Sequence, residues 1–98
     1  MELFVEFSVH EYMDMYPRKH VRTFIGESEE AIEKTAKEWA KQMTDMYSGG
    51  PTSFVKIMNK EEAEAHIKDV IAYEDAHPQE DSEDFKKDIL EIFHRCYN

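Results

Sequence analysis

Cysteine is almost absent from this sequence, since Cys96 is the single one among 98 residues. One cysteine forms no disulfide within the chain, so a packed core has to stabilise the fold, as is usual for proteins of a reducing compartment. A cytoplasmic location is therefore expected. Long apolar runs are missing too: none approaches the roughly 18 residues that a membrane-spanning helix needs. We expect no association with a membrane.

Glycine and proline are scarce, with three of each. No glycine-rich phosphate-binding loop is present, and Gly49 and Gly50 follow a helical pattern, where glycine commonly ends a helix. The loose set Glu62, His66 and Asp69 shares one helical face, but a zinc site takes three or four secure protein ligands. The sequence therefore predicts no enzyme: no catalytic residue, no metal and no cofactor.

Basic residues are outnumbered, with 12 Lys and Arg against 22 Asp and Glu, and the formal net charge is −10. Such a chain is repelled by free nucleic acid and by anionic membranes, and is attracted to basic protein surfaces. The charge is uneven: residues 1–58 carry a net of −3, and residues 59–98 carry −7. The second part of the chain is therefore predicted to present the acidic surface.

Hydrophobic residues make up 41% of the chain, which is enough for one core in a single domain spanning residues 1–98. Apolar residues at every second position predict strands, and apolar residues three and four apart predict helices. The predicted strands lie in residues 3–13, 21–26 and 52–59, and the predicted helices follow cap residues at Ser28, at Asn59 with Glu62, and at Asp81 or Ser82.

The expected fold is therefore α+β, with the order β-β-α-β-α-α and a three-stranded antiparallel sheet that has its helices on one face. Leu3, Val5, Phe7 and Val9 share one face of the first strand. The only tryptophan, Trp39, is central on the apolar stripe of the first helix. We expect its ring to be the centre of the core, packed against Val5, Phe7, Val55 and Ile57.

The stretch YEDAHPQEDSED, residues 73–84, contains six acids and no Lys or Arg. Asp81, Glu83 and Asp84 lie in or beside the first turn of a predicted helix, where negative charge is stabilising. The helix start gives no comparable explanation for Glu74, Asp75 and Glu80. Two interpretations stay open: a solvated connection between helices, or a recognition surface formed by Glu74, Asp75, Glu80, Asp81, Glu83 and Asp84.

A small basic and aromatic cluster lies near the first hairpin. Tyr and Met are common at interface cores, and Arg or Lys beside aromatic rings can contact phosphate or stack on a base. The net charge favours a hairpin turn made soluble by its charges. A secondary partner contact is nevertheless expected from Tyr12, Tyr16, Arg18, Lys19 and Arg22.

By its length, its charge of −10 and the stretch at residues 73–84, the chain resembles the small acidic inhibitors with which phages and plasmids block host defence, anti-CRISPR proteins in particular. The resemblance is one of overall profile and rests on no specific motif. It implies a non-enzymatic inhibitor that binds a basic protein surface as a nucleic-acid mimic. The implied partner is a nucleic-acid-binding effector such as a CRISPR nuclease, blocked at its guide or target channel.

A second hypothesis is a small structural or regulatory module that self-associates. Phe4, Phe54 and Met58 are expected on the sheet face opposite the core. Pairing of two copies would bury an apolar surface that a monomer should not expose. Both a monomer and a homodimer therefore stay open.

Overall fold

The computed structural model describes residues 1–10, 17–46 and 51–97, with side chains up to His94. It contains three strands and three helices in the predicted order, so the α+β class is confirmed. These elements are β1 (Glu2–Val9), β2 (Arg18–Ile25), α1 (Glu29–Met46), β3 (Thr52–Met58), α2 (Lys60–Ala76) and α3 (Ser82–Tyr97).

The sheet has the strand order β2-β1-β3, and β1 pairs antiparallel with both neighbours. Consecutive strands β1 and β2 form the predicted hairpin. The chain then crosses over the sheet through α1 before β3 pairs with the other side of β1. Among the described residues, β2 and β3 are the two edges of the sheet, each with one strand neighbour.

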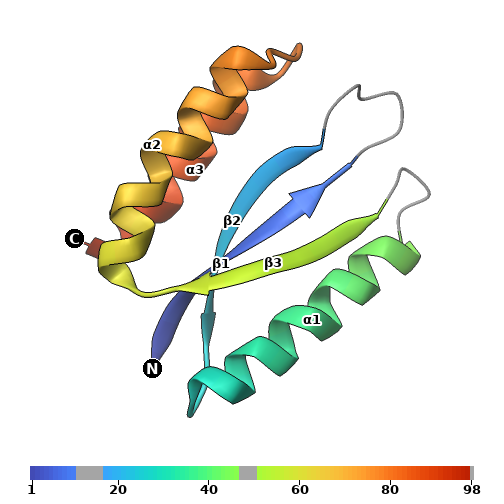
Figure 1. The fold of residues 1–98 in the computed structure, drawn as a ribbon, viewed down its shortest axis with the longest axis vertical. Coiled ribbons are helices and arrows are strands. Elements are labelled where there is room, and N and C mark those ends of the chain that lie inside the picture. The colour runs from blue at the N-terminus through green and yellow to red at the C-terminus, as the bar shows by residue number, and fades with distance from the viewer. Residues whose placement is uncertain (11–16, 47–50, 98) are drawn as a thin grey trace.

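Helices cover both faces of the sheet, so the expectation of helices on one face was wrong. Figure 1 shows α1 on one side of the strands and α2 beside α3 on the other. The reason lies in β1, which is apolar on both faces. Val5 and Phe7 pack with Ile32 of α1, whereas Phe4 packs under α2 and α3.

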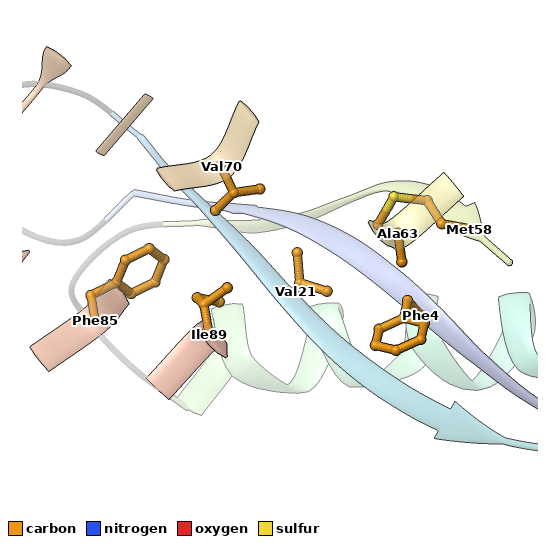
Figure 2. Close-up of a cluster of buried hydrophobic side chains, with 7 residues drawn as sticks. All are labelled: Phe4, Val21, Met58, Ala63, Val70, Phe85 and Ile89. Carbon is orange, nitrogen blue, oxygen red and sulfur yellow. The ribbon is translucent and has the colours of Figure 1, made fainter. Parts of the chain in front are cut away.

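The core is correspondingly divided into two clusters. The one beneath α2 and α3 is drawn in Figure 2 and contains Phe4, Val21, Met58, Ala63, Val70, Phe85 and Ile89. Phe4 and Met58 are only 5% and 1% exposed. The open apolar sheet face that motivated the self-association hypothesis is therefore not present.

A bulge in β3 changes which side chains face α1. Phe54 pairs with Phe7 and Lys56 pairs with Glu6, so Val55 is an extra residue without an opposite partner. Phe54 therefore lies on the α1 face and belongs to that cluster, contrary to prediction. Val55 was expected in the core beside Trp39, but it is 46% exposed.

Phe7, and not Trp39, is the centre of the α1 cluster. Its ring is fully buried and lies 4.6 Å from the ring of Trp39, 5.9 Å from Phe24 and 6.4 Å from Phe54, measured between centroids. Trp39 is half-buried, and the guanidinium of Arg22 covers its ring at 4.9 Å. The predicted contact of Trp39 with Phe7 is correct, but its central place is not.

Local signals set the starts of α1 and α2 as predicted. The Ser28 hydroxyl accepts a hydrogen bond from the Ala31 N–H at 3.1 Å. Asn59 and Glu62 form a capping box, in which each side chain bonds the backbone N–H of the other residue. Before α1, Gly26 leaves room for Ile32, because a Cβ at position 26 would lie 2.8 Å from that side chain.

Candidate functional site

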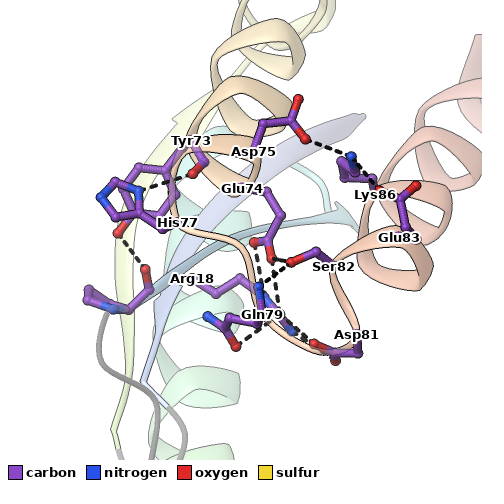
Figure 3. A network of polar contacts seen from close by, with 11 residues as sticks. Arg18, Tyr73, Glu74, Asp75, His77, Gln79, Asp81, Ser82, Glu83 and Lys86 are labelled. Atoms are coloured by element: carbon purple, nitrogen blue, oxygen red, sulfur yellow. Dashed lines mark hydrogen bonds and ion pairs between the residues drawn. The ribbon is translucent and has the colours of Figure 1, made fainter.

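Arg18 connects β2 to the acidic stretch between α2 and α3. It is 7% exposed, although it is the first residue of an edge strand. Its Nε and Nη2 donate to the two carboxylate oxygens of Glu74 at 3.2 and 3.1 Å. Nη1 and Nη2 donate to Asp81 at 3.2 and 2.7 Å. Two bidentate pairs of this kind are strong and directional, so they orient both acids around one guanidinium (Figure 3).

Two further residues close this arrangement. Nη2 of Arg18 donates to Gln79 Oε1 at 3.1 Å, and Ser82 Oγ donates to Glu74 at 2.6 Å. The guanidinium also lies 4.4 Å from the centroid of the Phe85 ring, a cation–π contact. We call Arg18, Glu74, Gln79, Asp81 and Ser82 the Arg18 network. It links β2 to the end of α2, the connection and the start of α3.

The electrostatics of the network favour the charged forms of Arg18 and Asp81. Burial by itself would lower the pKa of Arg18, but hydrogen bonds and charges from Asp81 and Glu74 outweigh it and raise that pKa. The hydrogen bond from Arg18 lowers the pKa of Asp81. One guanidinium thus bonds the carboxyl groups of two acids, Glu74 and Asp81. Because Nε, Nη1 and Nη2 of Arg18 all donate to side chains within the protein, the guanidinium has a structural role and is not placed to bind phosphate.

A second, more exposed bridge joins α2 to α3. Lys86 Nζ lies 2.6 Å from Asp75 and 3.0 Å from Glu83. Hydrogen bonds to Asp75 and then Glu83 raise the pKa of Lys86. Exposed pairs of this kind stabilise a fold little. They do, however, partly neutralise two of the acids that the sequence assigned to a recognition surface.

The six acids predicted to form one surface thus have different environments. Glu74 is 1% exposed, so its placement on a recognition surface was wrong. Asp81 is held by Arg18, and Asp75 and Glu83 by Lys86. Only Glu80 and Asp84 are exposed and without an ion pair to another described residue. The cause is the buried Arg18, which is distant in sequence.

The predicted basic and aromatic cluster is also divided. Arg18 points into its network, Lys19 Nζ lies 5.2 Å from the Tyr73 ring on α2, and Arg22 covers Trp39 on the α1 side. Tyr12 and Tyr16 lie outside the described residues. Side chains that follow one another along β2 are therefore directed to different neighbours, and the described ones form no single basic patch.

His20 lies in β2 between these groups, and its ring centroid is 5.8 Å from that of Phe85. Burial lowers the pKa of His20 to about 4 from 6.5, and the charges of Arg22 and Arg18 act in the same direction. Asp88 on α3 opposes them. The folded protein therefore holds this imidazole neutral well below the pH at which the unfolded chain protonates it.

This difference predicts a loss of stability in acid. Between pH 6.5 and about 4 the unfolded state binds the His20 proton and the folded state does not. The free energy of unfolding should therefore fall as the pH falls through that range, by about 3 kcal/mol from this group. Urea unfolding at pH 7 and pH 4 measures this loss in the free energy of unfolding. In His20→Gln the loss between the two pH values should be smaller by the contribution of His20. The exposed His94→Gln is the control; equal losses in wild type and His20→Gln would contradict the assignment.

A second interior pair joins β1 to α2. The Glu6 carboxylate, 4% exposed, contacts Nε2 of His66, and Nδ1 of His66 lies 3.9 Å from Asp69. The Glu62 carboxylate instead accepts a hydrogen bond from the Asn59 backbone N–H at the start of α2. Among the described side chains, no group of three or more His, Cys, Asp or Glu residues is placed to hold a metal ion.

One side of α3 retains an exposed acidic surface that the sequence analysis predicted only in part. Asp84, Asp88 and Glu91 recur at helical spacing i, i+4 and i+7, and Glu80 lies just before the helix. All four are exposed, and none forms an ion pair with another described residue. We call Glu80, Asp84, Asp88 and Glu91 the α3 acidic row. The periodicity within residues 83–97 was the available signal for its last two members.

No described helix is both long and apolar enough to cross a membrane. The described residues therefore contain the Arg18 network, a basic cluster whose members contact different neighbours, and the exposed α3 acidic row. Comparison of the chain with protein-family models, with curated proteins and with solved structures gave no match.

Proposed function

We propose that this protein is a non-enzymatic inhibitor that binds a basic, nucleic-acid-binding protein surface through the α3 acidic row. The main support for this proposal is the row of exposed carboxylates at Asp84, Asp88 and Glu91, which lie on one side of one helix. Residues three and four apart on a helix lie about 5–6 Å apart. This spacing is comparable with that of phosphates along a nucleic-acid strand, which a groove rich in Lys and Arg is built to accept.

The Arg18 network supports this proposal indirectly. It ties the start of α3 to β2 through Asp81 and Ser82, and Lys86 ties the same helix to Asp75 on α2. A row on a helix anchored in this way is already ordered before binding, so less conformational entropy is lost when a partner binds. Glu74 and Asp81 act in this proposal as supports for the row and not as contacts.

The net charge of −10 adds to the local row. A field of one sign accelerates encounter with a partner of the opposite sign and discourages binding to free nucleic acid. The resemblance to anti-CRISPR-type inhibitors suggests a specific target within this class. An RNA-guided nuclease, whose guide and target channel is basic, is the partner that we propose to test first.

Charge reversal on the row should weaken inhibition. The double variant Asp88→Lys with Glu91→Lys is expected to slow association with the nuclease about tenfold and to flatten its salt dependence. Both positions lie beyond the first turn of α3, so the helix dipole is little affected. Stopped-flow or biolayer association rates at several salt concentrations, together with displacement of labelled target DNA, give the measurement.

The matched control is Glu38→Lys with Glu64→Lys, which changes the net charge equally at exposed mid-helix positions elsewhere. This control should retain most of the association rate. Circular dichroism of both double variants checks that they are folded. If the two pairs lose the same amount, the overall charge and not the α3 acidic row directs binding, and the proposed surface is wrong.

A further inference from the structure

A groove lies between the first turns of α1 and the outer edge of β3. It has a volume of about 380 Å³ and is bounded by three glutamates of α1, Glu29, Glu30 and Glu33, and by residues 54–57 of β3. Small-molecule pockets in proteins have volumes of about 300–1,000 Å³, so this groove is at the lower end of that range. None of its lining belongs to the Arg18 network or to the α3 acidic row.

The floor of the groove is residues 54–57 at the outer edge of β3, beyond Thr52, whose backbone N–H and C=O bond the Thr44 hydroxyl of α1 at 2.9 and 3.1 Å. β3 pairs with β1 on one side, and no described strand pairs with its other side. Val55, the extra residue of the bulge, is 46% exposed at this edge, and Phe54 and Ile57 are only half-buried. An unpaired edge with accessible apolar side chains is a template on which another extended chain adds as a strand.

The wall of the groove sets the charge of the chain that would fit. Three carboxylates from α1 face one ammonium group, Lys56, within the lining. Lys37 also lies beside the groove, 3.8 Å from Glu33 and 5.3 Å from the centroid of the Phe54 ring, so the three carboxylates exceed the ammonium groups around them by one. The groove therefore favours a basic occupant and repels an acidic one. A second copy of this chain is disfavoured, because each copy would bring its own three glutamates to the junction.

We propose that the β3 edge binds an extended, basic segment of a partner protein, which adds to the sheet as a fourth strand beside α1. This inference rests on the proposed function and deepens it, since it names a structural element of the basic partner. Side chains alternate along a strand. Lys or Arg at every second position would face Glu30 and Glu33, and the β-branched residues between them would cover Val55.

The test uses a labelled peptide of eight residues in which Lys and Val alternate. Fluorescence anisotropy should show binding, with amide shifts of residues 54–57 in NMR spectra of the full chain. Glu30→Gln with Glu33→Gln should weaken binding about fivefold. Asp84→Asn with Asp88→Asn removes the same charge from the α3 acidic row, and each pair contains one first-turn acid. This control should change the affinity less than twofold.

Two altered peptides test the strand geometry. A peptide with four Lys followed by four Val has the same charge and should bind at least about fivefold more weakly, because only alternation matches both sides of the edge. N-methylation of every second amide should abolish binding for one set of positions and spare the other, since alternate residues face the neighbouring strand. Equal binding of all these peptides, or equal loss in the two protein variants, would overturn the proposal.

The same variants separate this inference from the proposed function. If the glutamine pair loses peptide binding while charge reversal on the α3 acidic row leaves nuclease inhibition intact, the proposed function fails and the strand site stands. If the reverse holds, the strand site fails. Sedimentation of the free chain is the final check: a dimer abolished by Glu30→Gln with Glu33→Gln would identify a second copy as the occupant and overturn a basic partner segment.

Discussion

Replacing Arg18 by methionine should lower the free energy of unfolding by about 3–5 kcal/mol. The reason is the environment of Glu74, which is 1% exposed and takes two hydrogen bonds from this guanidinium. Methionine fills similar space against Phe85 but leaves a buried carboxylate without its cation. Domains of this size have total stabilities of about 5–15 kcal/mol, so the variant should be close to unfolding. Urea denaturation at pH 7, followed by circular dichroism, measures the loss.

The control variant also removes the buried Glu74 carboxylate that Arg18→Met leaves without its cation. In Arg18→Met with Glu74→Leu, both partners become apolar, and much of the lost stability should return, because a buried ion pair is often matched by packed hydrophobic side chains. Arg18→Lys should not restore stability, since a single ammonium group cannot bond both carboxylates bidentately. A loss below about 1 kcal/mol in Arg18→Met, a value typical of exposed pairs, would show that the network is solvated.

Truncating Phe7 to alanine should cost a similar amount, about 3–5 kcal/mol. Phe7 is fully buried, and its ring meets those of Trp39, Phe24 and Phe54 on three sides. Its removal leaves a cavity between the sheet and α1 that rigid neighbours fill only in part. Thermal and urea unfolding give the free-energy change, and a red shift of the Trp39 emission reports water reaching the indole.

Trp39→Ala is the informative comparison. Because the Trp39 ring is half-buried at the rim of the cluster, its truncation should cost less than that of Phe7. Val55→Ala, at an exposed position, should change stability by less than about 0.5 kcal/mol. A larger loss for Trp39→Ala than for Phe7→Ala would return the tryptophan to the centre of the core, as the sequence had suggested.

The acids of the stretch at residues 73–84 differ in burial and in their partners. Glu74 is buried and Asp81 is exposed, and both bond the guanidinium of Arg18, which gives these two acids a structural role within the chain. Glu80 and Asp84 are exposed, and on α3 they continue into Asp88 and Glu91. The stretch is therefore neither a plain linker nor one uniform surface.

Local interactions made part of this structure predictable. Period-two alternation found β1, β2 and β3, and the cap residues Ser28 and Asn59 found the starts of α1 and α2. Each of these signals acts between residues that are close in sequence, so backbone preference and hydrogen bonding nearby are enough to read them. The order of the elements and the α+β class followed from the same signals.

Contacts between distant residues decided the rest. The Arg18 network joins residues 56 to 63 positions apart, and no local pattern indicates that Glu74 lies inside while Glu80 lies outside. The bulge at Val55 depends on the register between β3 and β1, and it moved Phe54 to the other face. The sequence alone determined the elements, their order and the sign of the charge. Tertiary structure decided which acids are buried and that both sheet faces are covered, because burial and register depend on pairing across the whole chain.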